Sequence, residues 1–351
     1  MIDHRNKFRT IALLSVTVMV MFLFSLGNQT SVASAKEYKF KCANVLGPGT
    51  GMWKAGNEFA QRVEKATNGQ IKITMYPPGS LVGTMEVFEA LRGGLIDMSW
   101  LTSEYWAGKD PAFAFVTYLP GGFDNPLLHD FWLYERGGMK LIRELYSKYN
   151  TYPLSMPYYP AEYLTSRVPI RSIADIKGKK LVFSGAMATK LFTKLGASTV
   201  SMPTGERPAA LERGVIDGGD IGVPSTTVAI GADRVAKYLL RPSLHQPSSA
   251  LELNINMNVW KSLPEELQAI LETEAYDLAW RNYRYTLDLD QKALKKMRDG
   301  GLQEYTLPEA EVREVRRMAV AAWEEVAQNT EMGKKLMESQ LAVMREFGLI
   351  E

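Results

Sequence analysis

The chain has 351 residues, 41 Lys+Arg against 39 Asp+Glu, and a formal net charge of +2. This near balance gives no reason to expect nucleic acid or an anionic membrane surface as a partner. One cysteine, Cys42, excludes an internal disulfide. Because Cys42 lies in an alternating, strand-like run at residues 38–45, we expect a small buried residue rather than a reactive thiol. The length is sufficient for two domains with separate cores.

The N-terminus has the pattern of a secretory signal peptide. Basic residues precede an apolar run at residues 11–26, and Ala33 and Ala35 stand three places and one place before Lys36. A retained membrane anchor is the alternative, but the run is shorter than the roughly 20 apolar residues of a spanning helix. The sequence therefore predicts that residues 1–35 are removed and that the mature protein is exported to the periplasm.

A short internal repeat organises the next part of the chain. Residues 90–97 read ALRGGLID and residues 210–217 read ALERGVID, with five of eight positions identical. In each copy a β-branched run, a Pro/Gly turn and a helix precede the shared glycine, and an apolar strand follows it. The glycine suits the left-handed end of a helix, and strand, helix and parallel strand form a right-handed βαβ unit. The repeat predicts two similar α/β lobes with a cleft between them.

Two capped helices are expected at the C-terminus. Ser262-Leu263-Pro264-Glu265 and the matching segment at residues 306–309 have the form of capping boxes with an early proline. The first helix runs to about Asp299, so at roughly 50 Å it is long enough to brace both lobes. We therefore assign 36–160 mainly to lobe 1, 161–255 mainly to lobe 2 and 256–351 to bracing helices.

The sequence contains few residues suited to catalysis. After residue 35 there are two histidines, His129 and His245, and no HExxH, GxSxG or CxxC pattern. The glycines at residues 46–51 lack the ending of a phosphate-binding loop. In open α/β sheets ligands bind beyond the carboxyl ends of the strands, so the loops at residues 100–106 and 218–224 should face the cleft. These features favour a binding protein, not an enzyme.

Several segments together resemble one receptor family. Residues 105–115, 169–178 and 210–217, with the signal peptide, look like the solute receptors of tripartite ATP-independent periplasmic (TRAP) transporters, the DctP-type family. The similarity is closest to the branch that binds 2-keto acids and lactate. It implies a two-lobe periplasmic binding protein fold with crossing segments, and a receptor that delivers a small organic acid to membrane permease subunits. Two alternatives remain, a periplasmic enzyme acting on a small acid and a receptor that feeds a sensor.

The resemblance also implies a set of site residues. In that branch a strand arginine holds the ligand carboxylate, and Val182 occupies its position here. A Glu-Trp pair that binds a metal corresponds to Asp220-Ile221, in which Asp220 offers a carboxylate and Ile221 a backbone carbonyl. A metal-binding Gln corresponds to Glu162. The family's Trp-His-Glu-Pro segment reads Leu-His-Gln-Pro here, which makes Gln246 the residue expected to face the ligand.

These departures change the charge expected in the site. Val182 cannot form the bidentate Arg–carboxylate contact, and Glu162 and Asp220 would be costly to bury without a positive partner. We therefore expect these two residues, with Ile221, to flank Ca²⁺, Na⁺ or a cationic ligand group, with no organic cofactor. Carboxylates solvated at the cleft rim are the alternative. The other residues expected to shape the pocket are Tyr105, Phe183 and Gln246.

Overall fold

The computed structural model describes residues 36–350, and the predicted signal peptide lies outside this range. From Tyr38 onward the described chain forms one compact unit. Among the residues described, no helix has the length and apolar character needed to cross a membrane.

The first lobe is built on a five-stranded sheet in the order β2-β1-β3-β12-β4. Its strands are β1 (Tyr38–Asn44), β2 (Ile71–Tyr76), β3 (Met98–Leu101), β4 (Thr151–Ser155) and β12 (Glu252–Asn256). Strands β1, β2 and β3 are parallel, and β12 is antiparallel to both β3 and β4. Helices α2 (Gly51–Ala66) and α3 (Val87–Arg92) connect the parallel strands.

The second lobe is built on a six-stranded sheet in the order β13-β10-β6-β9-β7-β8. Its strands are β6 (Leu164–Ser166), β7 (Lys180–Val182), β8 (Ser198–Val200), β9 (Gly218–Asp220), β10 (Tyr238–Arg241) and β13 (Gln303–Thr306). Strand β7 is parallel to β8 and β9, and β6 is antiparallel to β9. Helices α6 (Ala186–Lys194), α7 (Arg207–Glu212) and α8 (Pro224–Ala229) belong to this lobe.

The repeated unit is confirmed, and it is longer than the matching sequence. The series β1-α2-β2-α3-β3 and β7-α6-β8-α7-β9 place their first strand between the other two, with an antiparallel strand from the opposite half of the chain beside the third. Gly94 and Gly214 end the two equivalent helices with φ of 78° and 69°, the left-handed conformation that glycine adopts without strain.

The aspartate of each repeat fastens two neighbouring strands. Asp97 Oδ2 accepts from the backbone N–H of Lys41 at 2.8 Å, and Asp217 Oδ2 accepts from that of Lys180 at 3.0 Å. The aspartate N–H groups in turn donate to the carbonyls of the same lysines. Because this clamp supplies partners for the backbone of Lys41 in β1 and of Lys180 in β7, the shared Ile-Asp sequence has a structural reason in both lobes.

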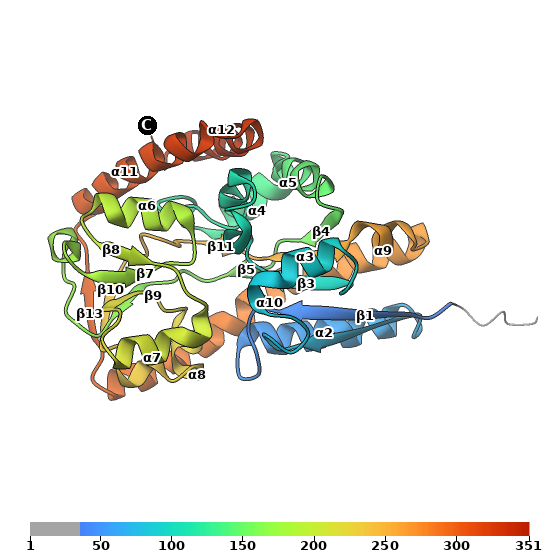
Figure 1. Cartoon of the computed structure of the whole chain (residues 1–351), viewed down its shortest axis with the longest axis horizontal. Helices are drawn as coiled ribbons and strands as arrows, with labels where there is room; N and C mark the ends of the chain where they lie inside the picture. The colour runs from blue at the N-terminus through green and yellow to red at the C-terminus, as the bar shows by residue number, and fades with distance from the viewer. Residues whose placement is uncertain (1–35, 351) are drawn as a thin grey trace, which may run out of the picture. The chain divides into compact units, whose positions relative to one another are not determined.

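Two sets of helices bridge the lobes (Figure 1). Helix α10 (Glu265–Asp299) packs on α2 of the first lobe and α8 of the second, which confirms the predicted bracing helix. The predicted capping box is not formed, because Pro264 is the N-cap residue and the Ser262 hydroxyl donates to the Val259 carbonyl instead. On the opposite side α11 packs on α6, and α12 packs on α4 and α5. These elements are α4 (Pro126–Glu135), α5 (Gly138–Ser147), α11 (Glu309–Ala327) and α12 (Glu331–Glu346).

The chain crosses between the lobes more than once. The predicted division at residue 160 falls between β6 and the short strand β5 (Tyr158–Tyr159), which pairs with β11 (Ser249–Ala250). After β11 the chain returns to the first sheet as β12, continues through α9 (Met257–Lys261) into α10, and joins the second sheet as β13.

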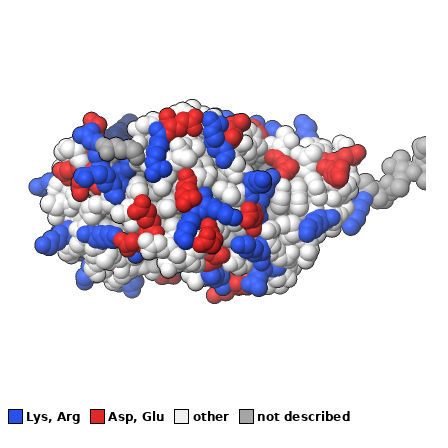
Figure 2. Space-filling model, turned by 90° about the horizontal axis from the view of Figure 1, so that it is seen from above, with Lys and Arg blue, Asp and Glu red and all other residues white. Residues whose placement is uncertain are grey.

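Figure 2 shows the face seen from above, where Lys/Arg and Asp/Glu side chains are interspersed. Glu325 of α11 pairs with Lys190 of α6 at 2.6 Å and also with Lys194. This face therefore carries mixed charge rather than a broad area of one sign.

Candidate functional site

A small cavity lies where the carboxyl ends of the strands of both lobes meet. It is lined by Leu46 and Tyr105 from the first lobe and by Ser184, Arg207 and Asp220 from the second, and its volume is about 50 Å³. A single water needs roughly 10–15 Å³ on this measure. The cavity therefore has room for a few water molecules or for a small polar solute.

A second cavity of about 160 Å³ adjoins the first. Pro78 of the first repeat and Pro203 of the second both line it, so the equivalent turns of the two lobes contribute to the same cavity. Four residues, Val45, Leu46, Tyr105 and Thr204, line both cavities. The two cavities are therefore neighbouring parts of one cleft between the lobes.

The charge at the centre of the site comes from Arg207, at the start of α7. Its Nη1 lies 3.0 Å from Asp220 Oδ1 and also donates to the Asp220 carbonyl. Nη2 donates to Ser184 Oγ at 2.6 Å, and both Nε and Nη2 donate to the Met202 carbonyl. The Arg207 side chain is 1% exposed. Burial alone would raise the pKa of Asp220, but Arg207 holds that pKa below its ordinary value.

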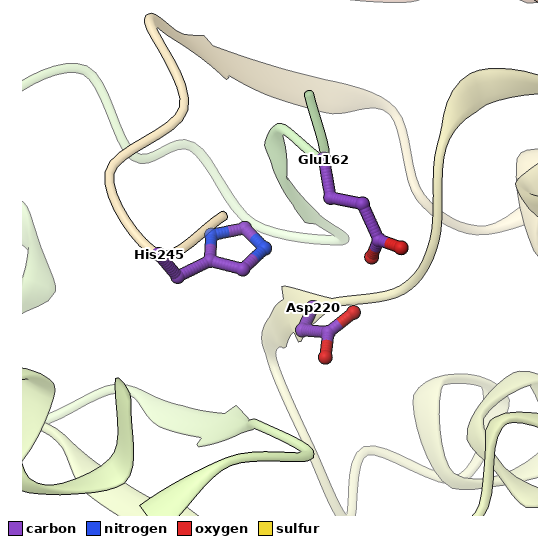
Figure 3. Close-up of side chains that lie close together, drawn as sticks. All are labelled: Glu162, Asp220 and His245. Atoms are coloured by element: carbon purple, nitrogen blue, oxygen red, sulfur yellow. The ribbon is translucent and has the colours of Figure 1, made fainter. Parts of the chain in front are cut away.

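Beside this ion pair, three buried side chains form a group with the composition of a metal site. Glu162, Asp220 and His245 each offer one atom, and these atoms lie within 4.8 Å of one another. Figure 3 shows the Glu162 carboxylate turned toward Asp220, with the His245 ring beside them. Glu162 Oε2 and both ring nitrogens of His245 have no hydrogen-bond partner within the described chain. Since buried polar atoms are normally paired, these atoms are available to a bound ion, water or solute.

A proton on Glu162 competes with an incoming cation. Burial, and then the charge of Asp220, raise the pKa of Glu162 well above its ordinary value. Burial lowers the pKa of His245 to about 4. Both shifts favour the uncharged form of the group concerned, and Arg207 already balances the Asp220 carboxylate. A cation that binds here replaces the Glu162 proton, because metal ligands must be deprotonated.

The structure brings together four of the residues predicted from the sequence. Tyr105, Glu162, Asp220 and Gln246 line the cavity. The backbones of Glu162 and Gln246 form an isolated β-bridge, in which the Glu162 N–H donates to the Gln246 carbonyl at 3.0 Å. This bridge explains why two residues more than 80 positions apart reach the same site.

The other three predicted ligand residues have buried side chains outside the cavity lining. Val182 and Ile221 belong to the small apolar core of the second lobe, which also contains Leu211 of α7. Phe183 packs against Phe192 with ring centroids 4.3 Å apart, and its ring lies 5.5 Å from that of His245. Phe183 therefore supports the position of His245.

The expectation that the protein itself supplies no cation to the site is wrong, because Arg207 is present and fully buried. The sequence held a signal for it. Residues 84–97 and 204–217 align without a gap, and Arg207 occupies the place of Val87, a residue 4% exposed in the first lobe. A charged side chain at a buried position of a repeated helix is rarely tolerated without a partner, so this difference pointed to the site.

Two similar lobes that enclose a polar cavity at their strand ends define a two-lobe solute-binding receptor. Residues 42–330 match the family described as bacterial extracellular solute-binding protein, family 7, or DctP. The chain belongs to this family, which confirms the resemblance to TRAP receptors. The family consists of extracytoplasmic binding proteins rather than enzymes.

The chain is similar over nearly its full length to characterised relatives. It is 25% identical to the monocarboxylate 2-oxoacid-binding periplasmic protein of Nostoc sp., over 98% of this chain and 94% of the relative. It is 26% identical to the C4-dicarboxylate-binding periplasmic protein of Rhodobacter capsulatus, over 89% of this chain and 92% of the relative.

Solved TRAP receptors share the fold. The receptor from Pseudoalteromonas atlantica, with bound sodium and pyruvate, has a TM-score of 0.82 at 25% identity and covers 89% of this chain and 95% of its own. The receptor from Colwellia psychrerythraea, with bound calcium and pyruvate, has the same TM-score and identity over 89% of this chain and 96% of its own. The predicted two-lobe fold is thus confirmed.

Proposed function

We propose that this receptor captures a small organic acid together with Ca²⁺ or Na⁺ in the cavity between its lobes and delivers the acid to TRAP permease subunits. The observation that carries the proposal is the buried group formed by Glu162, Asp220 and His245, whose facing atoms lie within 4.8 Å and are partly unpaired. Solved relatives with bound pyruvate hold sodium or calcium.

The donor atoms favour a hard cation. Glu162 and Asp220 offer carboxylate oxygens, and Gln246, which donates its Nε2 to Ser249 at 3.0 Å, retains its amide oxygen as an acceptor. Oxygen donors suit Ca²⁺ and Na⁺, whereas coordination by the His245 imidazole would favour a transition metal. Comparing Ca²⁺ with Zn²⁺ therefore shows whether His245 is a ligand or a neighbour of the ion.

Arg207 is the residue that we expect to hold the acid group. Its Nη2 donates to Ser184 Oγ, and that hydroxyl also donates to Asp220 Oδ2 at 2.8 Å. A ligand carboxylate can replace Ser184 as the acceptor for Nη2, because the hydroxyl then keeps its bond to Asp220. The exchange gains a charge-assisted hydrogen bond without leaving a buried group unpaired. One guanidinium would in this way link the metal ligand Asp220 to the solute.

Native mass spectrometry of the exported protein, as purified and after treatment with EDTA, tests the proposed function. The expected result is a mature chain that begins at Lys36 and carries a small acid with a metal ion. A bound solute without an acid group would overturn the proposal, and so would a solute that stays bound with unchanged affinity when every metal is removed.

Two further experiments separate the alternatives. A periplasmic enzyme would convert its acid, so recovery of the bound acid chemically unchanged after long incubation supports a receptor. Transport of the acid that depends on both this protein and TRAP permease subunits supports import, whereas an intact transport rate in cells that lack this protein points to a sensor.

A further inference from the structure

A second buried carboxyl group, that of Glu104, lies close to the cavity but does not line it. Glu104 belongs to the short helix η2 (Ser103–Trp106), which follows β3 in the first lobe. The residue is 5% exposed, and neither of its carboxyl oxygens has a hydrogen-bond partner of good geometry in the described chain. A buried carboxyl group in this condition is costly, and solute binding as proposed above gives it no role.

Glu104 faces the second lobe at the beginning of α6. Gly185 is the N-cap residue of this nine-residue helix, and the backbone N–H of Ala186 is directed at the Glu104 carboxyl group. A Cβ atom built on Gly185 would lie 2.4 Å from Glu104 Oε2 and 3.2 Å from the Tyr118 hydroxyl. A methyl group at Gly185 would therefore collide with the Glu104 carboxyl group unless that side chain or the lobes moved apart.

We propose that Glu104 and the first turn of α6 at Gly185 form a closure contact, which locks the lobes together once the solute is enclosed and which takes up a proton on Glu104. The contact joins η2 of the first lobe to α6 of the second, so separating the lobes breaks it and exposes Glu104 to water. This inference rests on the proposed function in one respect: both require that the lobes close around a solute.

The charges around Glu104 explain the proton. Glu252 of β12 and Asp220 of β9 face it as carboxyl groups, Tyr118 faces it with a neutral hydroxyl, and the Ala186 N–H is the helix donor. Burial, and then Glu252, raise the pKa of Glu104 well above its ordinary value, which outweighs the lowering by Ala186. Closure therefore favours the neutral acid form of Glu104, whereas in the open form this carboxyl group is ionised above its usual pKa of about 4.3.

The difference in the pKa of Glu104 between the open and closed forms makes closure depend on pH. A group whose pKa rises on closure favours the closed form at low pH and loses this contribution as pH rises toward its closed-form pKa. Glu104 should therefore lower solute affinity as pH rises, by at most about tenfold per pH unit for one proton, when wild type is compared with a variant that cannot ionise at this position. Glu104→Gln keeps the shape and remains neutral, so it removes this dependence.

The first test changes the lobe-2 side of the contact. Gly185 has φ −103° and ψ 144°, a conformation that alanine adopts readily, so Gly185→Ala should fold normally and obstruct closure alone. With pyruvate and CaCl₂ as the probe, its Kd should rise at least about tenfold. Adding Glu104→Ala to Gly185→Ala removes the overlapping atoms and should restore most of the lost affinity.

Closure itself can be followed with spin labels attached to two introduced cysteines, Met85→Cys and Val200→Cys. Met85 and Val200 are 50% and 38% exposed and lie in different lobes. Cys42 is buried and the pKa of its thiol is raised by burial, so it should remain unlabelled. Gly185→Ala should lengthen the distance between the labels, and the double variant should return it to the wild-type value.

Each outcome decides the inference. Equal label distances in wild type and Gly185→Ala, or an affinity loss that Glu104→Ala does not rescue, would overturn the closure contact. A pH dependence that is unchanged in Glu104→Gln would overturn the proton uptake, because titration of Glu162 contributes equally to both proteins. If wild type does not bind pyruvate with Ca²⁺, pyruvate is not its solute, and the label distances alone decide whether Gly185 limits closure.

Discussion

Arg207 Nη1 and Asp220 Oδ1 form an ion pair 3.0 Å apart, and their side chains are only 1% and 4% exposed. Arg207 begins α7 and Asp220 ends β9, so the pair ties the repeated helix of the second lobe to its sheet. The strongest negative charge of the cavity is thus balanced before any solute enters. Folding and solute recognition consequently depend on the same guanidinium.

The stability of the second lobe should depend strongly on this pair. Arg207→Met leaves Asp220 buried without a positive partner and should lower the free energy of unfolding by about 3–5 kcal/mol. Arg167→Met is the control, because Arg167 pairs with Asp217 at 2.8 Å while its own side chain is 35% exposed, and such pairs contribute about 0–1 kcal/mol. Urea denaturation measures both, and equal losses for the two variants would contradict a special role for Arg207.

Asp220 should be required for binding the cation and the solute. Asp220→Asn removes a carboxylate from the metal group and should weaken binding of pyruvate with Ca²⁺ at least about tenfold, or about 1.4 kcal/mol, in calorimetric titration. Asp217→Asn is a matched control three residues earlier, since Asp217 clamps the backbone N–H of Lys180 and does not line the cavity. Wild-type affinity in Asp220→Asn would show that the proposed site is wrong.

The backbone before Asp220 should tolerate only glycine. Gly219 has φ 128°, and a Cβ atom there would lie 2.2 Å from the Val182 carbonyl oxygen. Gly219→Ala should therefore lower the melting temperature far more than Gly79→Ala, where φ is 75° and no atom lies within 4 Å. The control carries only the left-handed strain of about 1–2 kcal/mol. Similar melting temperatures for the two variants would mean that β7 and β9 separate easily.

The buried acid Glu252 should make stability depend on pH. Its Oε1 accepts from the Tyr146 hydroxyl at 2.9 Å and from Thr117 at 3.1 Å, yet burial raises the pKa of Glu252 to about 7. Its unfolded-state pKa is lower, so this residue disfavours folding as pH rises from about 4.5 to 7. Glu252→Gln should therefore gain stability relative to wild type across this window, by up to about 3 kcal/mol. A stability difference that is constant from pH 5 to 8 would contradict the assignment.

The fold could be predicted from the sequence because the patterns that specify it are local. The left-handed glycines, the Ile-Asp clamps and the long C-terminal helix each depend on residues close together in the chain or on one strand pair, and a second copy of the pattern made them conspicuous. The boundaries were less accurate at the start of α10, where Pro264 rather than Ser262 is the N-cap. Proline fixes its own φ and needs no N–H, so the helix begins there without a side-chain cap.

The sequence by itself determined two lobes with a cleft at the strand ends, and the resemblance to TRAP receptors added the polar residues Glu162, Asp220 and Gln246, which line the cavity with Tyr105. Only the tertiary structure decided that Arg207 balances Asp220 and that Glu104 meets Gly185 across the lobes. The physical reason is that each of these contacts joins a side chain on one element to a different element. They form only after the chain has crossed between the sheets and the elements have packed. A pattern of neighbouring residues specifies the elements, but the distance between two such atoms is set by the packing of the whole molecule.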